Sequence, residues 1–255
     1  MLGSRRPATL SYRANALRRC SNGAESKPPV SSRGSPYGAG RNDLIRERSL
    51  LDQIRLRRQA QSVPFLPPPR SAAWAHQDAR SGFEVVYCQP HDDGHLLTGA
   101  TTAVEHGQSW IVDYEIRVDA GWRTRAARVT GHSCTGARTR LLEGDGEGRW
   151  RIDSEPAPQL DGCLDVDLES SAMTNTLPVH RLALTTGATA QAPAAYVRAL
   201  DLSVERLEQQ YTRTTDLHGH QRYDYTAPAF DFSCQLVYDE AGLVLAYPGI
   251  AVRTF

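Results

Sequence analysis

The stretch at residues 160–182 reads LDGCLDVDLESSAMTNTLPVHRL, and its first half decides the fold class. Asp165 and Asp167 alternate there with Val166 and Leu168. Because an extended chain places successive side chains on opposite faces, the spacing predicts a strand with one acidic face and one apolar face. The carboxylates then either face water or line a polar interior.

The water-facing interpretation is the favoured one. Antiparallel sheets ordinarily expose one face to solvent, whereas a barrel that is polar inside and apolar outside needs lipid or covering elements. A mixed arrangement would put Asp161 at the rim and leave the other acids exposed. Further along, Pro178 suits the first residue of the next strand, which needs no hydrogen-bond donor there. The preceding Thr174–Thr176 fits a side-chain-capped turn as well as a ligand-binding loop.

The same alternation recurs over much of the chain from Trp74 onward. It is clearest in Trp110–Val118 and Phe230–Tyr238, and the second of these is followed by a hairpin that puts Gly242 at a left-handed position. Residues 203–210 fit either a helix or a strand. Many short strands separated by turn signals predict an antiparallel sandwich or barrel.

The N-terminal part has a different composition. Residues 1–41 are rich in Arg, Ser, Gly and Pro and predict a disordered basic tail. Residues 42–62 have the spacing of a basic amphipathic helix, which is either solvated or in contact with a membrane surface. A Pro-rich linker at 63–72 leads to a β-domain at 73–255.

Bulk composition excludes several classes of function. Lys plus Arg and Asp plus Glu both number 29, so no net charge attracts nucleic acid. No apolar run is long enough to span a bilayer, and no export signal opens the chain. The five cysteines form no CxxC pair, which predicts reduced thiols, no metal site and a cytoplasmic location. Motifs for common enzyme classes and cofactors are also missing.

Several segments together carry a family resemblance: Gly148–Trp150, Leu160–Leu168, Thr174–Pro178, Tyr223–Tyr225 and Gly242–Gly249. In this order they resemble the putative glycolipid-binding family of bacterial proteins, over about residues 72–255. The resemblance implies a single β-rich domain with a strongly curved or closed antiparallel barrel. It also implies a glycolipid or another lipid-like small molecule as the binding partner.

The candidate ligand contacts are aromatic and charged side chains. Aromatic rings pack on acyl chains and stack on sugars, and an inward-facing arginine needs an acid or an anionic head group as its partner. We expect arginines beside the apolar strands to form, together with Glu84, the polar end of a cavity. The full set is Glu84, Trp110, Tyr114, Arg128, Trp150, Asp161, Asn175, Arg181, Tyr196, Arg198, Tyr211, Tyr223, Tyr225 and Tyr247.

The predicted function is non-enzymatic binding of an amphipathic small molecule inside a soluble β-barrel, without a cofactor. One alternative is a hydrolase or isomerase that acts on such a ligand with a buried Asp or Glu as base, because burial can raise a carboxyl pKa into a useful range. Another is an interaction module whose working part is the basic N-terminal segment. An unfilled interior of roughly 300–1,000 Å³ would favour binding or catalysis over the module.

Overall fold

The computed structural model describes residues 65–78 and 80–255. The tail expected at 1–41 and the helix expected at 42–62 lie outside the described residues. Antiparallel strands dominate the described part, forming one sheet of 14 strands and a second of three. The prediction of a mainly antiparallel all-β fold is therefore confirmed.

The elements follow one another as short strands with few helical turns. The first group is β1 (Ser71–His76), β2 (Ser81–His91), β3 (Gly94–Glu105), β4 (Gln108–Val118), β5 (Thr124–Ser133), β6 (Gly136–Gly144), β7 (Trp150–Ile152), β8 (Glu155–Pro156) and β9 (Asp165–Leu168). A single α-helix among the described residues, α3 (Thr176–Leu182), separates this group from the next. The second group is β10 (Thr189–Gln191), β11 (Ala194–Val197), β12 (Val204–Leu207), β13 (Gln210–Leu217), β14 (His220–Ala227), β15 (Phe232–Tyr238), β16 (Val244–Tyr247) and β17 (Ala251–Arg253).

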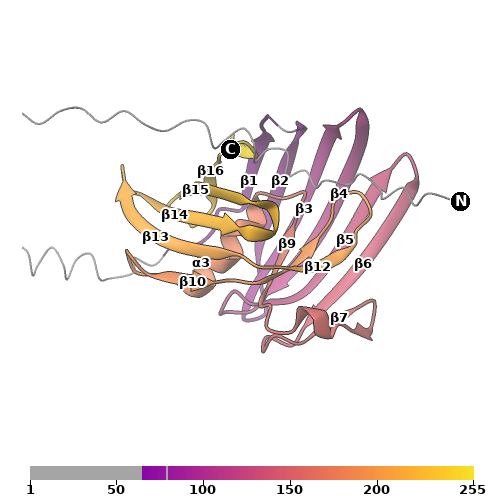
Figure 1. Cartoon of the computed structure of the whole chain (residues 1–255), viewed down its shortest axis with the longest axis horizontal. Helices are drawn as coiled ribbons and strands as arrows, with labels where there is room; N and C mark the ends of the chain where they lie inside the picture. Colours follow the sequence, from indigo (N-terminus) through magenta and orange to yellow (C-terminus); the bar gives the residue numbers. More distant parts are fainter. Residues whose placement is uncertain (1–64, 79) are drawn as a thin grey trace, which may run out of the picture.

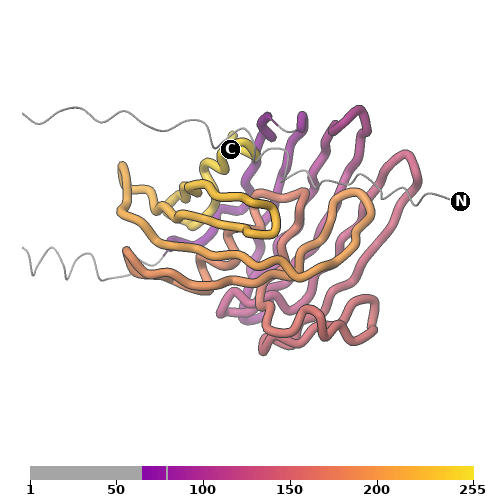
Figure 2. Tube along the Cα trace, viewed as in Figure 1, coloured from indigo at the N-terminus to yellow at the C-terminus, as the bar shows by residue number. Residues whose placement is uncertain are grey.

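The large sheet has the order β10-β13-β14-β15-β16-β17-β1-β2-β3-β4-β5-β6-β7-β8. Strand β1 pairs with both β2 and β17, so the C-terminal strand lies beside the first strand, as Figure 2 shows at the yellow and indigo ends of the trace. The end strands β10 and β8 do not pair with each other. The sheet is therefore curled and open rather than closed into a barrel.

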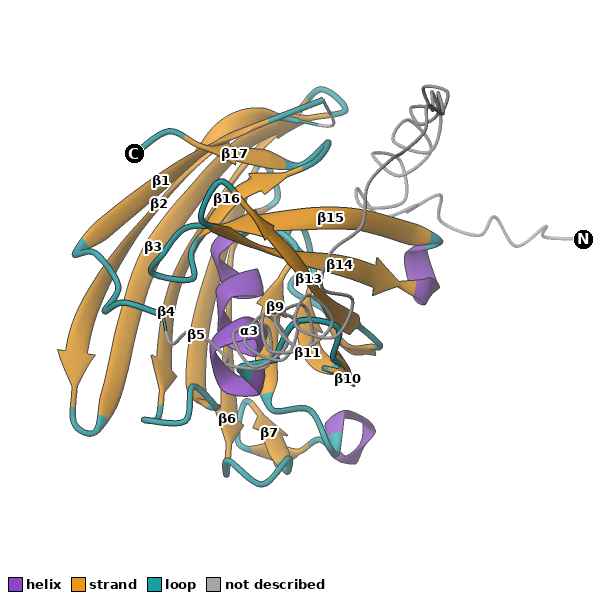
Figure 3. Ribbon diagram, turned by 90° about the vertical axis from the view of Figure 1, so that its left-hand side faces the viewer, coloured by secondary structure: helices purple, strands orange, loops and turns teal. Residues whose placement is uncertain are grey.

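The curl brings two arms of the sheet around a shared interior. Strands β13 to β15 run across the direction of β2 to β6 (Figure 1), and α3 and β9 lie on the concave side of the sheet (Figure 3). The small sheet, in the order β12-β11-β9, belongs to this inner layer. The concave side is thus covered by a segment of the same chain.

Residues 165–179 form the centre of this inner layer, and every one of them is buried. The prediction of a water-facing acidic strand is wrong, because Asp165 and Asp167 are 1% and 3% exposed. Strand β9 pairs in parallel with β11, and parallel strands are usually covered on both faces. Asp161, before the strand, is exposed.

Pro178 begins no strand, contrary to the prediction. It is the third residue of α3, after Asn175 at the N-cap position. The first amide groups of a helix have no partner within the helix, so a proline there removes no intrahelical hydrogen bond. The helix ends at Leu182, and the C-cap residue Ala183 is left-handed with φ of 43°.

Two local predictions are resolved at the C-terminal side. Residues 204–207 form β12, so the ambiguous segment is a strand. The turn between β15 and β16 contains Gly242 with φ of +71°, as the hairpin prediction requires. Asp239 stabilises this turn, since its Oδ1 accepts hydrogen bonds from the amides of Ala241 and Leu243 at 2.9 and 2.8 Å.

Candidate functional site

Glu84 is a carboxyl enclosed by the curled sheet. It faces the core from β2 and is 0% exposed. Tyr114 Oη donates a hydrogen bond to Glu84 Oε1 at 2.8 Å, and Ser171 Oγ donates to the same oxygen. The Ala172 amide donates to Oε2 at 2.7 Å. One acid from the large sheet thereby holds residues 165–179, here called the inner segment, at two consecutive residues.

Burial sets the acidity of this carboxyl. Loss of water raises the pKa of Glu84, and the hydrogen bonds from Ser171, Tyr114 and Ala172 oppose this rise. A raised pKa is also what a general acid or base requires. Such a group must reach a substrate, however, and both oxygens of Glu84 accept hydrogen bonds from groups of the protein itself.

Gly99 makes room for the tyrosine that reaches Glu84. Gly99 and Tyr114 are register partners on β3 and β4. A Cβ atom at Gly99 would lie 2.4 Å from the Tyr114 ring and 2.6 Å from the carbonyl oxygen of Val85. The absence of a side chain therefore lets the phenol pass over β3.

Replacing Gly99 with alanine tests this arrangement. We expect Gly99→Ala to lower the free energy of unfolding by about 1–3 kcal/mol, the usual cost of overpacking, measured by urea denaturation. Gly131→Ala is the control, because its Cβ would meet Leu202 at the milder distance of 3.3 Å. Equal stability of Gly99→Ala and the unmodified protein would contradict the packing described.

Asp165 and Arg181 form a second buried group. Arg181 donates from Nε to Oδ1 at 3.0 Å and from Nη2 to Oδ2 at 2.5 Å. The exposed fractions of the two side chains are 2% for the acid and 12% for the arginine. Burial raises the pKa of Asp165, while the guanidinium opposes the rise. This two-point pairing ties β9 to α3.

Asp167 is a further buried acid. Its Oδ1 accepts a hydrogen bond from Thr174 Oγ1 at 2.9 Å, and its Oδ2 accepts one from Gln209 Nε2 at 2.5 Å. The Thr174 amide in turn donates to Ser171 Oγ at 3.3 Å. A continuous chain of polar contacts thus runs from Glu84 through Ser171 and Thr174 to Asp167.

Tyrosines of β13 to β16 complete the network. Tyr211 Oη donates to Asn175 Oδ1 at 3.0 Å, and Tyr238 Oη donates to the Asn175 carbonyl oxygen at 3.2 Å. Their rings belong to a core of tilted and edge-to-face pairs, with centroids 5.1 Å apart for Tyr211 and Tyr225 and 6.1 Å apart for Tyr225 and Tyr247. Aromatic rings and the inner segment therefore lie on the concave side.

The structure brings many of the predicted contact residues together, but around the protein's own inner segment. Glu84 meets Tyr114, Asn175 meets Tyr211, and Tyr223 packs against Tyr211 at 6.4 Å between centroids. Their role as ligand contacts stays a prediction.

The remaining predicted contacts have other partners. Trp150 is buried and donates from Nε1 to the carbonyl oxygen of Cys163 at 2.8 Å. Arg198 lies over the rings of Tyr196 and Phe230 and pairs with Glu205 at 2.5 Å. Arg128 and Asp161 are exposed on the surface, and Trp110 borders the hollow described next.

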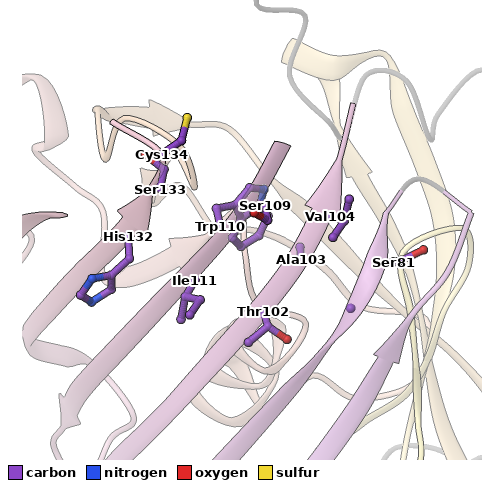
Figure 4. Close-up of a pocket in the computed structure, with 11 residues that line it drawn as sticks. Ser81, Thr102, Ala103, Val104, Ser109, Trp110, Ile111, His132, Ser133 and Cys134 are labelled. Carbon is purple, nitrogen blue, oxygen red and sulfur yellow. The ribbon is translucent and has the colours of Figure 1, made fainter. Parts of the chain in front are cut away.

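A hollow of about 620 Å³ crosses one end of β2, β3, β4 and β5 (Figure 4). Its exposed apolar side chains are Val104 and Ile111, with 53% and 41% exposed. They point away from the core, on the face opposite to Trp110, which is 3% exposed. The other lining side chains that reach the surface are Ser81, Thr102, Ser109, His132 and Cys134.

Apolar side chains continue from this hollow along the same outer face. Phe83 and Tyr87 of β2 are 42% and 53% exposed. Val85 lies between them and is register partner of Ala100 on β3. Contiguous exposed apolar surface commonly marks a binding site. We call the face formed by Phe83, Val85, Tyr87, Val104 and Ile111 the outer apolar face.

Sequence reasoning missed the outer apolar face because it took the apolar member of each alternating pair as inward. On β2 the odd-numbered and the even-numbered positions both contain apolar residues, so alternation alone does not show which face is buried. The available signal was the presence of apolar residues at positions of both faces in Phe83–Tyr87, a stretch that also contains the acid Glu84. In an ordinary two-faced strand, the face opposite the buried one would be polar.

A family model described as "Putative glycolipid-binding" matches residues 71–253. The chain belongs to this family. A crystal structure of a DUF1089 family protein from Pseudomonas aeruginosa is similar, with 33% sequence identity and a TM-score of 0.58, covering 73% of this chain and 94% of that chain. No curated protein matches. Membership suggests a binding role, and the predicted resemblance is confirmed.

The described part of the chain contains neither a candidate membrane-spanning helix nor a candidate metal site. No helix in residues 65–255, residue 79 apart, has the length and apolar character needed to cross a bilayer. Over the same residues, no three His, Cys, Asp or Glu side chains are grouped so that they could hold a metal ion.

Proposed function

We propose that this protein binds an amphipathic small molecule, a glycolipid or a similar lipid, on its outer apolar face and without chemical conversion. The supporting observation is the hollow of about 620 Å³ at Val104 and Ile111, within the range of about 300–1,000 Å³ common for ligand sites. The family description points to the same class of ligand.

The outer face supports this function better than the interior does. The concave side contains the buried segment 165–179 and the tyrosine rings, and the acids there hydrogen-bond to protein groups. An acyl chain placed on Val104 and Ile111 would instead cover apolar atoms that now face water. Burial of this kind stabilises a complex by about 25 cal/mol per Å² at most.

Binding of a simple alkyl glycoside tests the proposal. Decyl glucoside, kept below its micelle concentration, is titrated into the full chain and followed by calorimetry. We expect Val104→Glu to weaken binding about tenfold or more, because it places a carboxylate among apolar contacts. The folded state should survive, since the side chain at this position is half exposed.

Leu217→Glu is the matched control for this experiment. Leu217 is 49% exposed on β13, which is far from the hollow in the strand order, and its replacement should leave binding unchanged. Equal loss in both variants, or no binding to the unmodified chain, would overturn the proposal. Self-association that disappears in Val104→Glu would instead identify a second copy as the occupant of this face.

A further inference from the structure

A second hollow, of about 540 Å³, lies at the opposite end of β4. It is formed by the turn between β2 and β3 and by the loop between β4 and β5. Its charged lining residues are Asp92, Asp93, Arg117, Asp119, Arg123 and Arg125. In contrast to the first hollow, this one is dominated by hydrogen-bonding groups.

The two hollows are connected by one face of the sheet. Along β4, residues 109, 111, 113, 115 and 117 are exposed in alternation, so Ile111 of the first hollow and Arg117 of the second share the outer face. Six residues of strand separate them, which corresponds to about 20 Å. One acyl chain spans about 15 Å, half of a bilayer's hydrocarbon core, so a lipid with a head group fits this length.

The charges of the second hollow indicate the kind of head group. Three carboxylates and three guanidinium groups line it, so they balance. A phosphate would add negative charge that this balanced set does not neutralise. Hydroxyl groups, by contrast, use both kinds of partner, since carboxylates accept and guanidinium groups donate hydrogen bonds.

Part of this hollow is fixed in place before a ligand arrives. Asp119 Oδ1 accepts hydrogen bonds from the amides of Gly121 and Arg123 at 2.9 and 3.0 Å, and its Oδ2 lies 3.6 Å from Arg125 Nη1. Asp93 and Arg117, by contrast, form no ion pair with any described residue. Both side chains are also exposed, so a ligand can reach them without breaking an ion pair.

We propose that the second hollow is the head-group site for the ligand of the outer apolar face and takes an uncharged carbohydrate. This inference rests on the proposed function, because it assigns the polar end of the same bound molecule. The acyl chain lies along β2 and β3 from Val104 towards Tyr87. The sugar hydroxyls hydrogen-bond to Asp93 and Arg117.

Three probes with the same ten-carbon chain test the assignment on the full chain: decanol, decyl glucoside and decyl phosphate. We expect the glucoside to bind about tenfold more tightly than decanol, and the phosphate no more tightly than decanol. Arg117→Gln should remove the advantage of the glucoside and leave the affinity for decanol unchanged. Arg138→Gln, which changes an exposed arginine on β6, is the control and should alter neither affinity.

The outcomes separate the two proposals. If none of the probes binds, the proposed function itself fails. If decanol and decyl glucoside bind equally, or Arg117→Gln has no effect, the head-group assignment fails and the apolar site stands. Tighter binding of decyl phosphate than of decyl glucoside would overturn the uncharged class of head group.

Discussion

Glu84→Ala is expected to lower the free energy of unfolding by about 3–5 kcal/mol. The change leaves Tyr114 Oη, Ser171 Oγ and the Ala172 amide without their acceptor in the core. Each buried donor that loses its partner costs about 1–3 kcal/mol, and the lost side-chain volume adds to this. Urea denaturation followed by circular dichroism measures the effect.

Glu84→Gln is the matched control for this prediction. Its amide oxygen can accept from the Ala172 amide while its NH₂ group donates to the two hydroxyl oxygens, so we expect a loss of less than about 1 kcal/mol. If the Glu84→Ala and Glu84→Gln variants had equal free energies of unfolding, the three hydrogen bonds would not hold the inner segment.

A comparison of the unmodified protein with Glu84→Gln over pH reports the pKa of the acid. Because burial raises the pKa of Glu84, the folded state binds the proton more tightly than the unfolded chain does. The stabilisation is complete below the unfolded value of about 4.3 and is lost as pH rises through the folded pKa. The unmodified protein should therefore lose stability relative to Glu84→Gln in that window, by up to about 1.4 kcal/mol per pH unit. A pH-independent difference would contradict the shift.

The strand pattern was predictable from sequence because alternation is a local property. Trp110 to Val118 alternates in the sequence and in the structure, with every second residue buried. Gly242 was predictable for the same reason, since a left-handed turn position selects glycine within a few residues. Pairing of β1 with β17 is not local, so the strand pattern left a sandwich and a barrel open, and the family resemblance pointed to the curved sheet.

The position of residues 165–179 was not predictable from alternation. An acid on a strand ordinarily faces water, and Asp165 and Asp167 are buried only because Arg181, Thr174 and Gln209 supply partners. Two of these partners follow within 16 residues, yet nothing in their spacing shows that they fold back onto β9. The acids of this stretch thus hold the inner segment on the concave side of the sheet. Because the protein's own segment lies there, the proposed binding surface is on the outer side.

Asp165→Ala is expected to be the other severe substitution, with a loss of about 3–5 kcal/mol. It removes both acceptors of a guanidinium that is only 12% exposed, which leaves a largely buried charge without its partner. Thermal and urea unfolding of the variant measure the loss. Glu208→Ala is the control, because it removes an ion pair with Arg206 in which the side chains are 54% and 33% exposed, and exposed pairs contribute about 0–1 kcal/mol.

Removing the charge as well should recover part of the stability. In the double variant Asp165→Ala with Arg181→Met, no unpaired guanidinium remains, and the methionine chain fills a similar apolar volume. The double variant should therefore be more stable than Asp165→Ala alone, and the cycle of four proteins gives the coupling between the two side chains. If the loss of unfolding free energy in the double variant equalled the sum of the losses in the two single variants, the ion pair would contribute nothing to stability. Apolar packing alone would then hold α3 to β9.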